Sequence, residues 1–117
     1  MTSDELVEKV QIALSNAGLS NVVTLDCELS NGEVSLDRID SKVRGQGNGK
    51  RALECFLSIC DEHCLDIRLI VRPLDDSTDK AKLIAWYVRN DFVFVDGQCS
   101  KMRRKTCHRL LSSNDQN

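Results

Sequence analysis

Three glycines stand close together in the segment Arg44-Gly45-Gln46-Gly47-Asn48-Gly49-Lys50. Glycine lets the backbone bend tightly, so that successive N–H groups can turn toward one point. Such a concavity at the start of a helix suits a phosphate group. The alternative is a turn that merely connects two elements. Because the segment lies between a predicted strand and a predicted helix, an anion site is favoured.

The spacing of these glycines argues against two common classes of phosphate ligand, magnesium nucleotides and dinucleotides. The segment is one residue short of the P-loop pattern GxxxxGK[ST], and no serine or threonine follows Lys50, which argues against hydrolysis of a magnesium nucleotide. Its glycines follow GxGxG instead of GxGxxG, and the segment comes after a predicted hairpin instead of a first core strand. It is therefore not a dinucleotide fingerprint.

Six cysteines raise the alternatives of disulfides and of a metal site: Cys27, Cys55, Cys60, Cys64, Cys99 and Cys107. The first ten residues contain no apolar export segment, so the thiols are expected to stay reduced in a cytoplasmic protein. Cys60, His63 and Cys64 have helical spacing, but no pair of CxxC elbows is present. Since free cysteine is often buried, packing of Cys27, Cys55 and Cys60 in the core is preferred over a structural zinc.

The chain opens with the pattern of an amphipathic helix followed by a β-hairpin. Thr2 and Glu5 fit a capping box, and apolar residues then recur at helical spacing until Gly18. Residues 23–29 alternate apolar and polar side chains, as a half-buried strand does. Asn31-Gly32 then supplies a strong signal for a two-residue turn.

The returning strand, residues 34–41, contains a change of parity. Val34 and Leu36 share one parity, whereas Ile39 and Val43 lie on the other. A β-bulge would produce this slip, although a short strand that ends early would also explain it.

The middle of the chain predicts a crossover between parallel strands. Apolar residues from Ala52 to Cys64 mark a helix of about four turns, and residues 67–71 read as a buried strand. Strand, glycine segment, helix and strand together form a right-handed βαβ unit in which residues 34–41 and 67–72 are neighbours.

The last third of the chain predicts one more helix and a strand pair. After a polar loop at residues 75–79, the helix runs through residues 83–88 and stops near Asn90. Residues 92–95 and 99–105 read as two strands around Asp96-Gly97, and residues 112–117 as a disordered tail. With 117 residues and no internal repeat, a single domain over residues 1–117 is expected.

Charge and hydropathy exclude some functional classes. The formal net charge is -2, so the molecule as a whole does not attract nucleic acid or an anionic membrane. The basic cluster Lys101, Arg103, Arg104 and Lys105 is interpreted as a strand end or a solvated face, with a polyanion contact only as a runner-up. No apolar run has the length of a membrane span, which is roughly 20 residues.

Several of these segments together resemble the GNAT superfamily of acyl-CoA-dependent N-acyltransferases. That family's pyrophosphate loop has Gln or Arg, two residues, Gly, one residue, then Gly or Ala, and Arg44, Gly47 and Gly49 match its fixed positions. The segment from Leu83 to Phe92 is similar to the family's later helix, in which a tyrosine precedes a Gly-Phe pair, and Met102-Arg103-Arg104 resembles its closing strand. The resemblance covers roughly residues 22 to 105.

The resemblance implies a fold and a cofactor. The fold is α/β (α+β): a mixed, mostly antiparallel sheet with a central βαβ crossover whose parallel strands splay apart, and Pro73 would suit such a separation. The cofactor is acetyl-CoA (coenzyme A). Arg38 and Ile39 would flank the acyl group, and the pyrophosphate would meet the following residues: Val43, Arg44, Gly45, Gln46, Gly47, Asn48, Gly49 and Lys50.

The resemblance also makes Tyr87, the chain's single tyrosine, the candidate general acid at the coenzyme sulfur. A phenol has a pKa of about 10 and a cysteine-like thiol one of about 8.5, so the phenol can stabilise the leaving thiolate. The alternative is an ordinary core tyrosine, because its predicted helical face is otherwise apolar. Trp86 is expected to be a packing residue.

The sequence departs from the family in four places. Only one helix and one hairpin precede the glycine segment, where members usually carry a further strand and helix that build the acceptor site. Asp91 replaces the glycine of the Gly-Phe pair, and Lys80 stands where an asparagine often begins the helix. Ile70 and Arg72 occupy the usual place of a carboxylate. Glu28, Asp37 and Asp40 are nearby, and the choice of general base among them stays open.

Two functions follow as hypotheses. The first is an N-acetyltransferase that moves an acetyl group from acetyl-CoA directly to a primary amine of a protein or small molecule. The second is an inactive GNAT-fold module that binds coenzyme A or a protein partner. In either case a homodimer or another chain could complete the reduced acceptor site.

Overall fold

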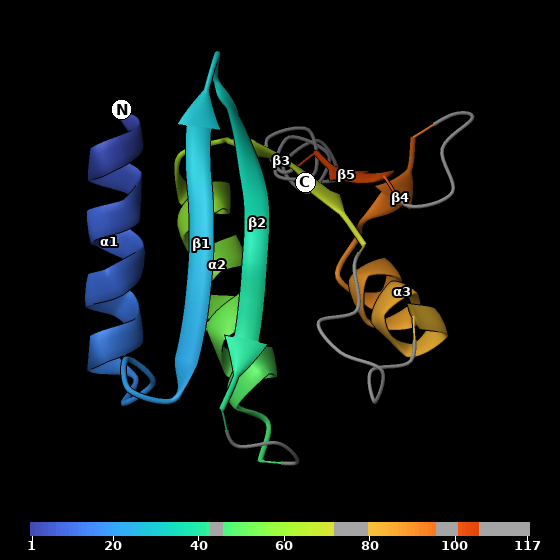
Figure 1. Ribbon diagram of the computed structural model, residues 1–117. Helices are drawn as coiled ribbons and strands as arrows, with labels where there is room; N and C mark the ends of the chain where they lie inside the picture. The colour runs from blue at the N-terminus through green and yellow to red at the C-terminus, as the bar shows by residue number, and fades with distance from the viewer. Residues whose placement is uncertain (43–45, 72–79, 96–100, 106–117) are drawn as a thin grey trace, which may run out of the picture.

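The computed structural model describes residues 1–42, 46–71, 80–95 and 101–105. Within them the chain folds as helix α1 (Ser3–Asn16), strands β1 (Val23–Ser30) and β2 (Glu33–Ser41), helix α2 (Asn48–Glu62), strand β3 (Asp66–Ile70), helix α3 (Lys80–Arg89) and strands β4 (Val93–Phe94) and β5 (Lys101–Arg104). Figure 1 shows α1 beside β1, α2 behind the β1–β2 hairpin, and α3 at the far side of β3. The element types and their order are those that the sequence predicts.

The opening helix has the predicted start. The Glu5 N–H donates to Thr2 Oγ1 over 3.2 Å, and the Thr2 N–H donates to Glu5 Oε1 over 3.3 Å, which confirms the capping box. The helix buries Leu6, Val10 and Leu14. Ser3 Oγ accepts a 3.0 Å hydrogen bond from the Leu29 N–H of the edge strand β1, so α1 also covers part of that edge.

The sheet has five strands in the order β1-β2-β3-β5-β4 among the described residues. The pairs β1–β2, β3–β5 and β4–β5 are antiparallel, and β2–β3 is parallel. The turn between β1 and β2 has positive φ at both Asn31 and Gly32, as a type I′ turn requires. The mixed, mostly antiparallel sheet with one βαβ crossover through α2 is the predicted architecture.

The predicted bulge lies in β2. Asp26 pairs with Arg38 and Cys27 pairs with Leu36, so Asp37 is the extra residue. Val34 and Leu36 before it are buried, whereas Asp37 and Arg38 are exposed. The change of parity in the sequence is therefore a bulge and not an early strand end.

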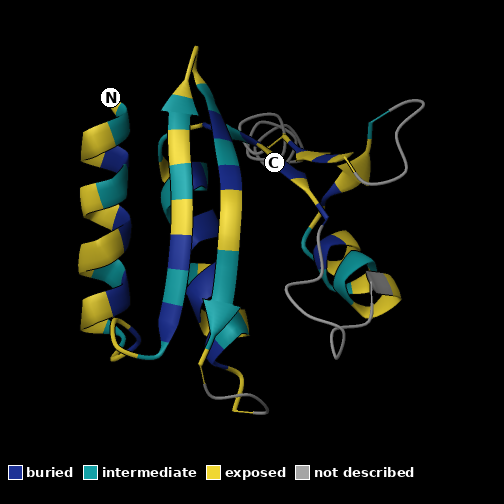
Figure 2. Ribbon diagram, viewed as in Figure 1, coloured by how far each residue is buried: buried dark blue, intermediate teal, exposed yellow. Residues whose placement is uncertain are grey.

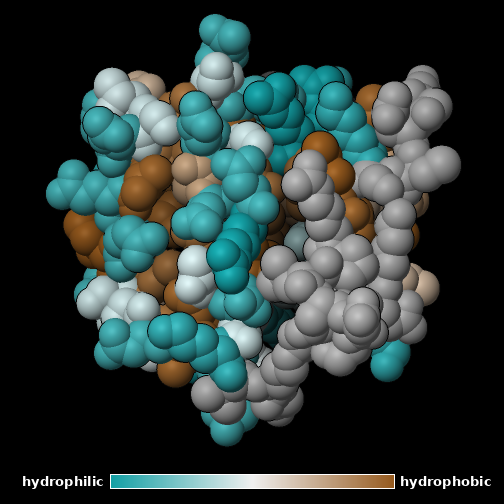
Figure 3. Space-filling model, viewed as in Figure 1, coloured by the Kyte–Doolittle hydropathy of each residue, from teal (hydrophilic) through white to brown (hydrophobic). Residues whose placement is uncertain are grey.

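One hydrophobic core lies between the sheet and the helices α1 and α2, with α3 contributing Tyr87. Figure 2 shows the buried residues of α1 and α2 turned inward. The other face of the sheet, turned away from α2, is called the outer face from here on. In Figure 3, which views that face, hydrophilic side chains gather over β1 and β2.

All three helices end in the same geometry. The residue in the left-handed region is Gly18 after α1, Cys64 after α2 and Asp91 after α3, with φ of +75°, +54° and +74°. The N–H of the following residue then bonds back to the helix, as from Leu65 to the Cys60 carbonyl over 2.8 Å. This Schellman arrangement satisfies carbonyls that the helix end leaves without partners.

Candidate functional site

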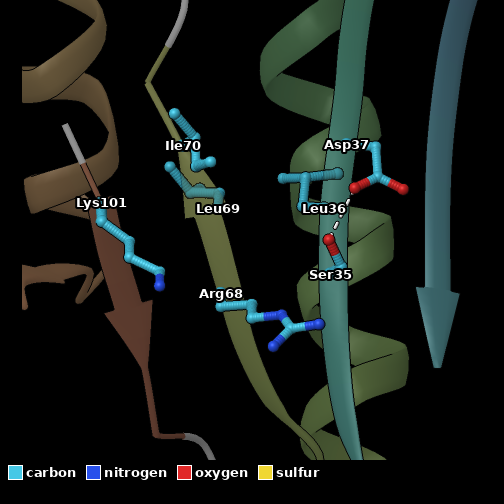
Figure 4. Close-up of a pocket in the computed structure, with 7 residues that line it drawn as sticks. All are labelled: Ser35, Leu36, Asp37, Arg68, Leu69, Ile70 and Lys101. Carbon is cyan, nitrogen blue, oxygen red and sulfur yellow. Dashed lines mark hydrogen bonds between the residues drawn. The ribbon is translucent and has the colours of Figure 1, made fainter. Parts of the chain in front are cut away.

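The parallel strands β2 and β3 separate at the bulge. Their pairing runs from Glu33 with Asp66 to Leu36 with Leu69 and stops there in the described part of the chain. Beyond this point β2 pairs with β1, and β3 pairs with β5. In Figure 4 β3 leans away from β2 past Leu36. The result, in the described part of the chain, is a wedge between two strands that no longer pair with each other.

Helix α2 begins beside this wedge without a side-chain cap. Its N-cap, Gly47, adopts φ +74°, and its first turn contains no acidic residue. The first helical bond runs from the Arg51 N–H to the Gly47 carbonyl over 3.0 Å, so the N–H groups of the preceding residues have no acceptor within the helix. The positive end of the helix dipole and the exposed Lys50 therefore make this terminus attractive to an anion.

The second cation of this turn has a structural role. Arg51 donates from Nη2 to the Ala17 carbonyl at the end of α1 over 2.8 Å. Its guanidinium thus neutralises the negative end of α1 and links the two helices. Lys50 is the basic side chain of this turn that has no such partner among the described residues.

The glycine segment and the helix of Tyr87 come together. A Cβ added to Gly49 would lie 3.9 Å from Cη2 of the Trp86 indole, and Trp86 is half-buried against the core. Trp86 is therefore the packing residue that the sequence predicts, and its indole lies beside the start of α2.

Tyr87 is buried, with 8% of its surface exposed. Its ring lies between Trp86, with centroids 5.2 Å apart, and Phe92, 5.4 Å away in an edge-to-face arrangement. Burial raises the pKa of the Tyr87 phenol to about 12, because an apolar environment disfavours the phenolate. The group therefore keeps its proton at ordinary pH.

The other residues assigned to the coenzyme fall into three groups. Gln46, Gly47, Asn48, Gly49 and Lys50 stand at the start of α2. Arg38 is exposed and pairs with Asp40 over 3.4 Å, while Ile39 is half-buried against the core; both follow the bulge, beside the wedge. Val43, Arg44 and Gly45 lie outside the described residues, as do Arg72 and Pro73.

A pocket opens on the outer face where the wedge begins. It has a volume of about 320 Å³ and is lined by Ser35, Leu36, Asp37, Arg68, Leu69, Ile70 and Lys101. Figure 4 shows that these residues come from β2, β3 and β5. Ser35 Oγ donates to Asp37 Oδ1 over 2.6 Å. Asp37 is the candidate base that the structure places in this pocket; Glu28 and Asp40 do not line it.

Arg68 and Lys101 were not recognised as pocket residues from the sequence. The available signal is their parity, since each alternates with a buried neighbour, Leu69 in β3 and Met102 in β5. Parity places both side chains on the outer face. It does not show that Ile70 and Lys101 pair across the two strands, because that pairing joins distant parts of the chain.

The interpretation of the basic cluster as a solvated face is wrong for Arg104. Only 2% of Arg104 is exposed, and its Nη1 and Nη2 donate to the two carboxylate oxygens of Asp61 over 3.0 and 3.1 Å. Its Nε donates to the Asn90 carbonyl over 2.9 Å. Arg104 therefore joins β5 to the end of α2 and to the turn after α3, and the cluster is not one basic surface.

The cysteines of the described chain are free thiols. Cys60 is buried, and Cys27 and Cys55 pack partly buried against the core, as predicted, whereas Cys64 is exposed. Cys99 and Cys107 lie outside the described residues. Among residues that the structure describes, no three potential metal ligands come together, and no helix is long and apolar enough to cross a membrane.

Comparison with solved structures identifies the fold. The chain matches the crystal structure of the anti-CRISPR protein AcrVA5 with a TM-score of 0.63 and 26% identity, over 71% of this chain and 90% of that one. It matches the PaiA N-acetyltransferase from Thermoplasma acidophilum, in complex with coenzyme A, with a TM-score of 0.53 and 20% identity, over 81% of this chain and 67% of that one. No protein-family model and no curated protein matches the sequence.

These matches confirm the resemblance to the GNAT superfamily at the level of the fold. The chain has a GNAT-like fold, with the splayed parallel strands and the helix start that the resemblance implies.

Proposed function

We propose that this protein is an N-acetyltransferase that moves an acetyl group from acetyl-CoA directly to a primary amine. The observation that carries the proposal is the uncapped start of α2 beside the β2–β3 wedge. A phosphate site and a gap between two strands, joined end to end, suit a long molecule with a diphosphate at one end and an extended arm.

The residues present fit coenzyme A. The first-turn N–H groups of α2 and Lys50 would hold the diphosphate, and no acidic side chain of that turn opposes it. Backbone groups of Arg38 and Ile39, beyond the bulge, would receive the acyl carbonyl and the extended arm. Bound acetyl-CoA supplies an activated thioester, whose C–S bond breaks as the amine nitrogen forms the new amide bond.

Tyr87 would supply the proton that the leaving sulfur requires. Its phenol is neutral at ordinary pH, since burial raises its pKa to about 12. A neutral donor near the sulfur stabilises the developing thiolate and then protonates it. The amine must lose a proton in the same overall reaction, so that the products are an amide and a free thiol.

A second candidate function is a coenzyme-binding module without turnover. The burial of Tyr87 between Trp86 and Phe92 favours it, because such packing would also suit a purely structural tyrosine. The two candidates share the coenzyme site and differ in whether a thiol is released.

The experiment uses two glycines with matched geometry. Gly47 and Gly32 have φ of +74° and +76°, and a Cβ at either would meet nothing within 4 Å, so a tryptophan costs similar backbone strain at both. We expect acetyl-CoA binding, measured by calorimetry, to be lost in Gly47→Trp and kept in Gly32→Trp. Incubation of the wild type with acetyl-CoA and a panel of amines is expected to release free thiol.

The outcomes separate the candidates. Binding without thiol release for any amine would leave the non-catalytic module. Absence of binding in the wild type, or equal binding by the two tryptophan variants, would contradict the coenzyme site on which both candidate functions depend.

A further inference from the structure

We infer that the pocket on the outer face receives a small amine that also carries an anionic group, such as an amino acid. This inference rests on the proposed function, because it names the class of acceptor for the same site. It is drawn from the charges and positions of the residues that line the pocket.

The strand register arranges the pocket in two rows across the sheet. Ser35 pairs with Arg68, and Arg68 pairs with Arg103. One step further along the outer face, past the point where β2 and β3 separate, Ile70 pairs with Lys101. Asp37 is the bulged residue of β2 at that level. The Asp37 carboxylate therefore lies on β2 and the Lys101 ammonium group on β5, while Arg68 of β3 turns its guanidinium toward Glu33 of β2.

Among the described residues, the cations around the pocket outnumber the carboxylates that pair with them. Glu33 accepts a 2.8 Å ion pair from Arg103 and a longer one, 3.6 Å, from Arg68. One carboxylate thus faces two guanidinium groups, and the shorter contact belongs to the one outside the pocket. Lys101 forms no ion pair with a described residue. An anion beside Lys101 would balance its charge.

The carboxylate side suits an ammonium group. Asp37 is exposed, and its Oδ1 accepts the hydrogen bond from Ser35, which leaves its other oxygen as an acceptor. In Figure 4 Asp37 lies beside Ser35 on β2, while Arg68 reaches toward β2 and Lys101 extends from β5. The carboxylate of Asp37 on β2 and the ammonium group of Lys101 on β5 would orient a molecule that carries both signs.

Size and lining indicate a small molecule. A volume of about 320 Å³ is at the lower end of ligand pockets, which span about 300–1,000 Å³. Ile70, half exposed at 50%, offers an apolar surface between the charged sides for a short hydrocarbon spacer. The pocket also adjoins Leu36 and Leu69, the last pair before the wedge, so an amine held there would lie next to the acyl group of the proposed reaction.

The test compares three amines that share a four-carbon chain: 4-aminobutyrate, butylamine and 1,4-diaminobutane. Each is titrated into the full chain with coenzyme A present, followed by NMR shifts of the backbone amides of Arg68, Ile70 and Lys101, and each is assayed for thiol release from acetyl-CoA. We expect 4-aminobutyrate to bind about tenfold more tightly than butylamine, because a charge-assisted contact contributes about 1.4 kcal/mol.

Three variants localise the effect. Lys101→Ala is expected to remove the preference for 4-aminobutyrate, and Lys101→Glu to reverse it in favour of 1,4-diaminobutane. Lys9→Ala removes an exposed cation on α1, away from the pocket, and is expected to leave the preference unchanged.

Failure of this inference differs from failure of the proposed function. Equal binding of the three amines, no binding of any, or a preference that survives in Lys101→Ala would overturn the inference even if thiol is released. A preference that depends on Lys101 without thiol release would support the pocket and contradict the transferase.

Discussion

At the scale of single residues, Tyr87 is the candidate general acid and is also packed as a core residue. Its ring lies between two aromatic neighbours, and burial raises the pKa of its phenol to about 12. The phenol therefore stays protonated at ordinary pH.

Replacement of Tyr87 by phenylalanine tests this role. The change removes only the hydroxyl, so we expect the free energy of unfolding to change by less than about 1 kcal/mol. We expect kcat to fall by about a hundredfold or more, which is the usual contribution of a general acid, with the KM for acetyl-CoA unchanged. Steady-state kinetics and chemical denaturation measure both quantities. An unchanged kcat would make Tyr87 a structural residue.

Asp91 holds a backbone conformation that suits glycine, since its φ is +74° at the end of α3. We expect Asp91→Gly to be more stable than Asp91→Ala by about 1 kcal/mol, because alanine is strained in the left-handed region. Both variants lose the carboxylate, so their difference isolates the backbone. Denaturation midpoints measure it.

The control for Asp91 is the same pair of substitutions at Glu54, an exposed position inside α2. There the order is expected to reverse, with alanine more stable by about 1 kcal/mol. If alanine were at least as stable as glycine at position 91, the positive φ would not be a source of strain.

At the scale of elements, the first turn of α2 lacks the features that usually stabilise the start of a helix. A helix of 15 residues begins with no side-chain cap and no acidic residue in its first turn, whereas α1 has a full capping box. Lys50 places a positive charge at the positive end of the helix dipole, which is unfavourable for the helix. An anionic ligand would accept hydrogen bonds from the first-turn N–H groups and would pair with the charge of Lys50.

Lys50→Glu is therefore expected to move stability and affinity in opposite directions. An acidic residue in the first turn stabilises a helix by about 0.3–1 kcal/mol, so the melting temperature is expected to rise slightly. The same carboxylate would repel a diphosphate, and coenzyme affinity is expected to fall by at least about tenfold. Calorimetry and thermal unfolding measure the two effects.

Lys9→Glu, on the exposed face of α1, makes the same change in net charge and serves as the control. We expect it to leave coenzyme affinity nearly unchanged, because charges more than about 10 Å apart are largely screened at ordinary ionic strength. Equal affinity losses in the two variants would point to overall charge and not to the helix start.

The elements themselves could be predicted where their signals are local. The capping box of Thr2 and Glu5, the Asn31-Gly32 turn and the parity change around Asp37 each involve residues a few positions apart, and each is confirmed. The ends of the short strands were less sharply predicted: β4 covers Val93–Phe94 within the predicted range 92–95, and β5 ends at Arg104, one residue before the predicted end. Strand ends depend on partners that propensity does not contain.

At the scale of the whole molecule, long-range partners decide what the sequence could not. Arg104 reads as one of several surface cations until Asp61, 43 positions away, is placed beside it. The pocket likewise needs β2, β3 and β5 in register before Asp37, Arg68 and Lys101 share one surface. Topology, and not local pattern, brings these side chains together.

The core also makes the whole molecule sensitive to alkali. Burial raises the pKa of the Cys60 thiol from 9.0 to about 12, and burial followed by the nearby charge of Asp37 raises that of Cys27 from 9.0 to about 11. With Tyr87 at about 12, the folded state keeps protons that the unfolded chain has lost. Unfolding then releases protons, so its free energy is highest below pH 9 and falls between about pH 9 and 12.

We therefore expect the midpoint of urea denaturation, measured under reducing conditions, to be constant from pH 7 to 8.5 and to decline above pH 9. Each proton released on unfolding lowers the free energy of unfolding by about 1.4 kcal/mol per pH unit. Cys60→Ala lowers stability at every pH through lost packing but should make the decline shallower, whereas Cys64→Ala removes an exposed thiol and should not. A decline of the same steepness in Cys60→Ala would show that this buried thiol is not its source.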